Sequence, residues 1–155
     1  MKVHNFLVDW IETYFKNRDI IAKQIEKIER KEGKIDLFIY HKTGKIKIII
    51  VKEILGSLKS TIDDFGNEEP NTEHVLVILN NKDNIKKIVE NWDLLHPRKN
   101  LAVYFVNPIS KTDTKWIIYP HTHHRITEKT VLESGLESIA VNVEEITLQE
   151  LEKTI

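Results

Sequence analysis

The chain contains no cysteine, and this absence excludes disulfide bridges, thiolate metal sites and a cysteine nucleophile. It also lacks an apolar run long enough to cross a bilayer, and residues 3–15 are amphipathic, unlike the uniformly apolar core of a signal peptide. No repeat or low-complexity segment marks a domain boundary within the 155 residues. We therefore expect a single domain, residues 1–155, that is cytoplasmic and has no membrane partner. The composition, rich in Ile and Lys, is also compatible with a thermophilic source.

The formal net charge of −1 conceals an uneven distribution of charge along the chain. Residues 1–60 contain 13 Lys and Arg against 8 Asp and Glu, whereas residues 61–155 contain 10 against 16. Such an asymmetry can present a basic face to a polyanion such as nucleic acid. Complementary charge between the two subunits of a homodimer, or an ordinary solvated surface, explains the same counts.

Hydrophobic periodicity predicts the order of the secondary-structure elements. Apolar residues at helical spacing predict a helix over residues 3–15. Residues 20–30 fit either a helix or a strand, and their short distance to Gly33 favours a strand. Further along, we expect a helix over 54–65, a buried strand over 74–79, a helix over 83–95 capped by Asp83, and strands over 101–106 and 116–119. The last part should contain a helix over 127–134 ended by Gly135, an edge strand over 139–143, and a helix opened by a capping box of Thr147 and Glu150.

The most informative stretch is residues 33–53, GKIDLFIYHKTGKIKIIIVKE. It reads as two strands, over 35–40 and 45–52, joined by a short turn in which Gly44 supplies the positive φ of a hairpin loop. The second strand is apolar on both faces except at Lys47, which predicts a central strand that is covered on both sides.

Asp36 and Lys52 stand out in these strands, because each places a charge where burial is costly unless the group is paired or bound. The stretch resembles the core hairpin of the PD-(D/E)XK nuclease superfamily, which includes archaeal Holliday-junction resolvases and many restriction enzymes. The pattern of that family is G-x-IDL-I followed by G-x, four hydrophobic residues and E-x-K. Asp36 matches its Asp and Lys52 matches its Lys, whereas Ile50 stands where the metal-binding Glu belongs.

The resemblance implies a mixed α/β sheet flanked by helices, with a restriction-endonuclease-like core. It covers residues 3–106 in element order and residues 33–53 in motif. It also implies metal-dependent phosphodiester hydrolysis, with Asp36 binding Mg²⁺ or Mn²⁺ and Lys52 assisting the attacking water. Because Ile50 supplies no oxygen, a second carboxylate has to come from elsewhere. The candidates are Glu12 of the first helix, Glu53, Asp63 and Asp64. The alternative is a buried Asp36–Lys52 ion pair at a site that has lost catalysis.

Two other groups of residues suggest a function. His121 and His123 form an H-x-H pair, and on an extended segment both imidazoles would face one way, which suits Zn²⁺ or Ni²⁺. A solvated histidine cluster is the ordinary alternative. Lysines gather at the tip of the predicted hairpin beside His41, where they can track phosphates or simply protect an edge. They are Lys42, Lys45 and Lys47.

These patterns favour nucleic-acid processing or binding by a degenerate nuclease-like domain. The alternatives are a non-enzymatic protein-interaction module on the same scaffold, and a small hydrolase that uses a histidine-bound metal. The three tryptophans, Trp10, Trp92 and Trp116, fit the apolar periods and are expected in the core, so the sequence predicts no aromatic platform for stacking bases.

Overall fold

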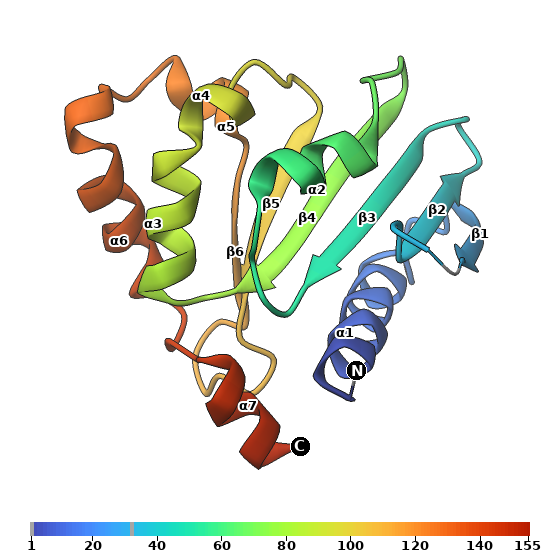
Figure 1. The fold of residues 1–155 in the computed structure, drawn as a ribbon. Coiled ribbons are helices and arrows are strands. Elements are labelled where there is room, and N and C mark those ends of the chain that lie inside the picture. The colour runs from blue at the N-terminus through green and yellow to red at the C-terminus, as the bar shows by residue number, and fades with distance from the viewer. Residues whose placement is uncertain (1, 32) are drawn as a thin grey trace.

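The computed structural model describes residues 2–31 and 33–155. Figure 1 shows one twisted sheet with helices on both sides. In chain order the elements are α1 (Lys2–Arg18), β1 (Ile25–Arg30), β2 (Leu37–His41), β3 (Ile46–Lys52), α2 (Leu58–Phe65), β4 (Thr72–Leu79), α3 (Lys82–Glu90), α4 (Trp92–Leu95), β5 (Leu101–Val106), β6 (Lys115–Ile118), α5 (Pro120–His124), the 3₁₀ turn η1 (Lys129–Val131), α6 (Leu132–Ala140) and α7 (Leu148–Thr154).

The six strands lie in the order β1-β2-β3-β4-β5-β6. β1, β2 and β3 pair antiparallel, β3, β4 and β5 pair parallel, and β6 returns antiparallel to β5. The parallel pairs require crossover connections, which α2 and the α3–α4 pair supply. The prediction of a mixed α/β sheet flanked by helices is therefore confirmed. No helix in the described part of the chain is long and apolar enough to span a membrane.

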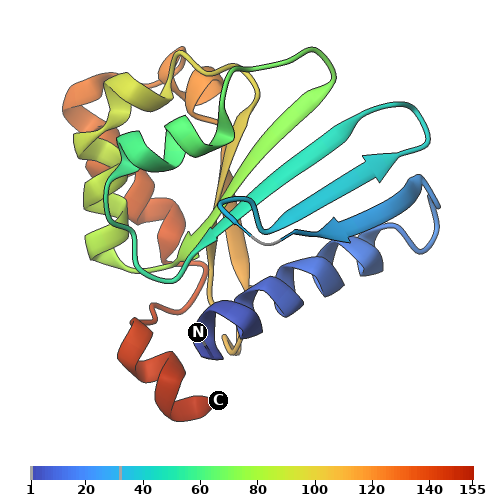
Figure 2. The ribbon, with the colours of Figure 1, turned by 45° about the vertical axis from the view of Figure 1, so that its right-hand side comes forward.

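The helices divide between the two faces of the sheet. α1 and α7 pack on one face, which we call the α1 face, through residues such as Leu7, Ile11 and Leu151. α2, α3, α4 and α6 pack on the other, which we call the α2 face. Figure 2 shows α1 running beneath β1 and β2, while α2 lies over the strands nearer the middle of the sheet.

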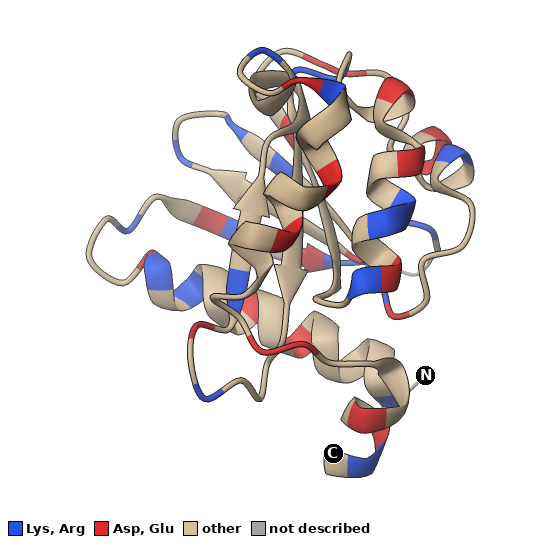
Figure 3. Ribbon diagram, turned by 90° about the vertical axis from the view of Figure 1, so that its left-hand side faces the viewer, with Lys and Arg blue, Asp and Glu red and all other residues tan. Residues whose placement is uncertain are grey.

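The uneven charge of the sequence persists in the folded molecule. Figure 3 shows Lys and Arg on the loops beside β1 and β2 and on the C-terminal part of α1, whose last turn contains Lys16 and Arg18. Asp and Glu lie along α6 and on the chain that leads into α7. The basic excess therefore belongs to the three antiparallel strands and α1.

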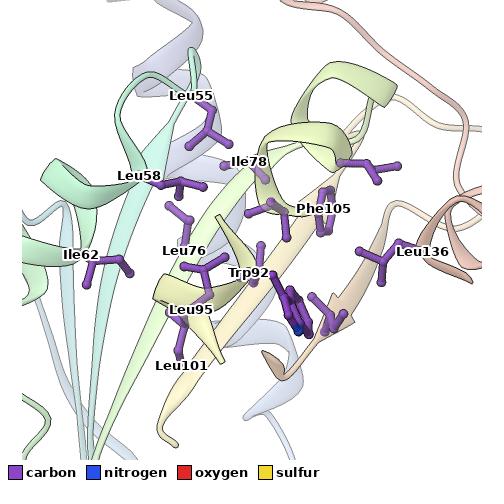
Figure 4. Packing of buried hydrophobic residues seen from close by; sticks show 14 of the residues in the cluster. Leu55, Leu58, Ile62, Leu76, Ile78, Trp92, Leu95, Leu101, Phe105 and Leu136 are labelled. Carbon is purple, nitrogen blue, oxygen red and sulfur yellow. The ribbon is translucent and has the colours of Figure 1, made fainter. Parts of the chain in front are cut away.

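The central strands are apolar because both of their faces are buried. All six residues of β5 are buried, and so are seven of the eight residues of β4. Figure 4 shows part of the cluster on the α2 face, in which side chains of α2 and α4 meet those of β4 and β5. The labelled examples include Leu58, Ile62, Leu76, Trp92, Leu95 and Phe105. Burial of this kind stabilises the fold by roughly 25 cal/mol for each Å² of apolar surface removed from water.

Most of the predicted elements are confirmed. The strand over 101–106 has the predicted bounds, and α1 extends the predicted helix by one residue at its start and three at its end. Gly44 has φ 88°, as the hairpin turn requires, and the capping box of Thr147 and Glu150 is present. Residues 20–30 do contain a strand, although it begins only at Ile25.

Three local predictions are wrong. Asn81 caps α3, because its side chain accepts a hydrogen bond from the Asn84 N–H at 2.9 Å, and Asp83 lies in the first turn instead. Gly135 does not end a helix over 127–134 but lies inside α6, where Leu132 and Leu136 follow the helical repeat into the core. The expected edge strand over 139–143 is absent from the described residues, and only Val143 forms a single bridge there.

Candidate nucleic-acid interface

Asp36 lies just before β2, beside the end of β3. Its carboxylate Oδ2 accepts a hydrogen bond from the Val51 N–H at 2.7 Å, and its Oδ1 lies 2.7 Å from Nε2 of His4 on α1. The side chain is only 14 % exposed. Because β2 begins only at Leu37, no backbone carbonyl of β2 accepts a hydrogen bond from the Val51 N–H. The carboxylate of Asp36 accepts it instead. These two contacts compensate the charge, and the sequence predicted neither of them.

Ile50 and Lys52 point to the α2 face of the sheet. Ile50 is 1 % exposed and belongs to the apolar cluster under α2, and alternation along β3 places Lys52 on the same side. The carboxylate of Asp36 instead reaches α1 through His4. Among the described residues, no ion pair within 4.0 Å links Asp36 to Lys52. The two residues therefore lie at the same end of adjacent strands without forming an ion pair.

Three of the other predicted carboxylates, Glu12, Asp63 and Asp64, form ion pairs elsewhere. Glu12 lies two turns along α1 from His4, about 12 Å away. Its carboxylate is 2.7 Å from Nζ of Lys16 and 2.9 Å from Nε of Arg30. Burial alone would raise the pKa of Glu12, but the hydrogen bonds from Lys16 and Arg30 lower it below its ordinary value. Glu53 follows β3 directly.

No group of three His, Asp or Glu side chains that could hold a metal ion is found within residues 2–31 and 33–155. The donors around Asp36 do not fit a divalent ion, because Ile50 brings no oxygen and both oxygens of Asp36 already have partners. The described residues thus offer no support for the predicted Mg²⁺ or Mn²⁺ site, which stays a prediction.

The predicted basic tip lies at the opposite end of β3 from Asp36, roughly 20 Å away for a strand of this length. Lys42 and Lys45 are exposed there. Lys47 is not part of the tip. Its Nζ lies 3.3 Å from a carboxylate oxygen of Glu73 and 5.7 Å from the ring centre of Phe15, so it covers the α1 face. Phosphate contacts at the tip would therefore come from the two exposed lysines.

The H-x-H pair is helical, so the predicted extended segment is wrong. In α5 the side chains of His121 and His123 are related by a rotation of about 200° around the helix axis, so they point to nearly opposite sides. His121 Nδ1 is 3.0 Å from the carbonyl oxygen of His96, and His123 Nε2 is 3.1 Å from the Thr127 hydroxyl. Burial lowers the pKa of His123. The two imidazoles hold α5 in place, and they do not converge on a common point.

The sequence missed a surface on β1 and β2. In β2, Leu37 and Ile39 are buried under α1, whereas Phe38 and Tyr40 alternate with them and point to the other side. Neither aromatic residue belongs to the apolar cluster on either face of the sheet. Figure 2 shows this side of β1 and β2 without a covering helix. We call it the open face, and it comprises Lys27, Glu29, Lys31, Phe38 and Tyr40.

No family model, curated protein or solved structure matches this chain.

Proposed function

We propose that the chain is a nucleic-acid-binding domain on a nuclease-like scaffold that has lost hydrolysis. The main support for the proposal is the open face, because this uncovered part of the sheet lies within the most basic part of the chain. Lys27 and Lys31 flank its rings, and Lys42 and Lys45 lie exposed at the adjoining turn. Lysines in such an arrangement hold phosphates without reading sequence.

The order of the elements supports the nuclease-like part of the proposal. One helix, three antiparallel strands, a second helix and a parallel strand follow one another from α1 to β4. This is the order over which the resemblance to PD-(D/E)XK nucleases extends. Ile50, buried in the place of a metal-binding Glu, supports the loss of hydrolysis. The absence of cysteine suits a reducing compartment, and we place the activity in the cytoplasm.

Fluorescence anisotropy with labelled single-stranded, duplex and four-way-junction oligonucleotides tests the proposal. Neutralising phosphates releases counterions, so four lysines predict an affinity that falls roughly 50-fold for single strands and roughly 150-fold for duplexes between about 50 and 200 mM salt. The double variant Lys42→Gln/Lys45→Gln should bind more weakly and depend less on salt. Lys111→Gln/Lys153→Gln, which removes the same charge from exposed positions elsewhere, is the matched control.

Two results would count against the proposal. One is the absence of binding to every oligonucleotide at the lower salt concentration. The other is equal weakening by the two pairs of Lys→Gln substitutions, because a general charge effect needs no particular face. Either result would leave the protein-interaction module as the better account of this scaffold.

A further inference from the structure

The rings of Phe38 and Tyr40 form a small platform on the open face. Their centroids lie 6.3 Å apart and their planes are within 15° of parallel. Both residues are half-buried, which leaves part of each ring accessible. In the neighbouring strand, Ile46 lies opposite Tyr40 and Ile48 lies opposite Phe38. These two isoleucines extend the apolar surface toward the middle of the sheet.

Each ring has a lysine above it. The ammonium nitrogen of Lys31 is 4.6 Å from the ring centre of Phe38, and that of Lys27 is 5.7 Å from the ring centre of Tyr40. Both side chains come from β1 or the residue that follows it, so they reach over the platform from its outer edge. Lysine stems are long and mobile, and their ammonium groups can leave a ring for a phosphate while remaining at the same edge.

Among the residues that the structure describes on the open face, one is acidic, Glu29. Its carboxylate is 3.1 Å from Nζ of Lys27 and is 29 % exposed. The hydrogen bond from Lys27 lowers the pKa of Glu29, so the carboxylate remains ionised and paired at neutral pH. Lys31 then leaves the face with a net positive charge. A cationic border around accessible rings complements a ligand that has both flat bases and phosphates.

Resting on the proposed function, we infer that the open face binds single-stranded nucleic acid by stacking unpaired bases on Phe38 and Tyr40. Every base has a flat π face that an aromatic side chain can stack on, whatever the sequence. In a duplex those faces are already stacked on neighbouring base pairs, and only the edges and the backbone are accessible. Lys27 and Lys31 would then hold the phosphates beside the stacked bases.

This assignment distinguishes the open face from an ordinary docking patch for another protein. An apolar groove for a peptide would be depleted of lysine at its centre. Here a lysine ammonium lies over each ring. The two rings also lie side by side on the surface of a sheet, like the aromatic side chains of RNA-binding sheets that stack successive bases. The face therefore fits a short stretch of about two unpaired nucleotides.

The test replaces each ring by leucine, which keeps apolar bulk in the strand but has no π face. Anisotropy is measured with a 12-nucleotide single-stranded DNA, a single-stranded RNA of the same length and a DNA hairpin duplex. We expect Phe38→Leu and Tyr40→Leu each to weaken single-strand binding by roughly 5- to 150-fold while duplex binding is unchanged. Tyr40→Phe, which keeps the ring, should bind as the unmodified protein does.

Tyr119→Leu is the matched control, because Tyr119 is 49 % exposed but lies beyond the open face, after β6. It should leave single-strand binding unchanged. Ultraviolet cross-linking of the unmodified protein to a bromodeoxyuridine oligonucleotide gives a second measurement that depends on no variant. Mass spectrometry should find the adduct at Phe38 or Tyr40.

The possible results separate this inference from the proposed function. If the protein binds single strands but the leucine variants bind equally well, or if adducts form only elsewhere, the inference is wrong and nucleic-acid binding stands. Tighter binding to the duplex than to the single strand would also show that the inference is wrong while nucleic-acid binding stands. If the unmodified protein binds no oligonucleotide, both the inference and the proposed function fail.

Discussion

The edge of the sheet formed by β1 and β2 is built differently from β3, β4 and β5, which we call the covered half, although the sequences of the strands look alike. β5 is buried at all six positions because helices cover both of its faces. β1 has three half-buried and three exposed residues, and β2 is buried only at the two positions that meet α1. Residues in the covered half are constrained by packing. Those on the open face are free of that constraint, which makes them available to bind a ligand.

The largest effect that the comparison predicts comes from a charge placed in the covered half. Ile50→Glu puts a carboxylate into the apolar cluster under α2, where the isoleucine is 1 % exposed. We expect the free energy of unfolding to fall by about 4–5 kcal/mol, as measured by urea denaturation. Adding Mn²⁺ should not restore stability, because the carboxylate of Asp36 is held by His4 and Val51.

Metal-dependent recovery of Ile50→Glu would contradict that description of Asp36. It would show that the two carboxylates can reach one ion, since a ligand that binds only the folded state stabilises it. The double variant Ile50→Glu/Asp36→Ala is the control, and any genuine recovery through Asp36 has to disappear in it.

A pair of phenylalanine substitutions compares the two halves directly. Phe105 is 0 % exposed and stacks on Trp116 with centroids 4.1 Å apart, so Phe105→Ala should cost about 3–5 kcal/mol. Phe38 is half-buried on the open face, so Phe38→Ala should cost about 1 kcal/mol. Urea denaturation of both variants measures the difference. Equal losses would mean that the open face is part of the core.

A smaller effect concerns acid stability. His74 is buried, stacks on Phe65 and accepts a hydrogen bond from Arg98 at its Nδ1, 3.1 Å away. Burial, followed by the nearby Arg98 charge, lowers the pKa of His74 below its ordinary value of 6.5. As the pH falls below about 6.5, His74 binds a proton in the unfolded chain but stays neutral in the folded protein. Stability should therefore fall by up to about 1.4 kcal/mol per pH unit.

Thermal denaturation between pH 7.5 and 5 measures this slope, and His74→Gln should flatten it. His41 and His123 also have lowered pKa values because of burial, so some slope should remain. An unchanged slope in His74→Gln would mean that these other histidines account for all of it.

The sequence predicted the fold better than the site because hydrophobic periodicity indicates which residues are buried. It does not indicate which helices or strands cover them. Residues 101–106 and residues 37–40 are both apolar runs, LAVYFV and LFIY. Only the tertiary arrangement shows that helices cover both sides of the first and one side of the second. The local pattern therefore does not distinguish Phe38 and Tyr40 from core residues.

Contacts between distant segments escaped prediction for a similar reason. His4 and Asp36 are 32 residues apart, and nothing in the local pattern joins them. Lys47 lies in the predicted group of lysines, but strand alternation directs it to Glu73 on the α1 face. The H-x-H motif has different geometry in a helix and in a strand, and Pro120 at the first position of α5 favours the helix.

The most direct test of the account compares the affinity of the unmodified protein for single-stranded and duplex DNA of equal length at one salt concentration. Anisotropy titrations at about 50 mM salt suffice. We expect the single strand to bind more tightly by at least roughly 5-fold, because only unpaired bases can stack on Phe38 and Tyr40. Equal or tighter binding to the duplex would contradict it.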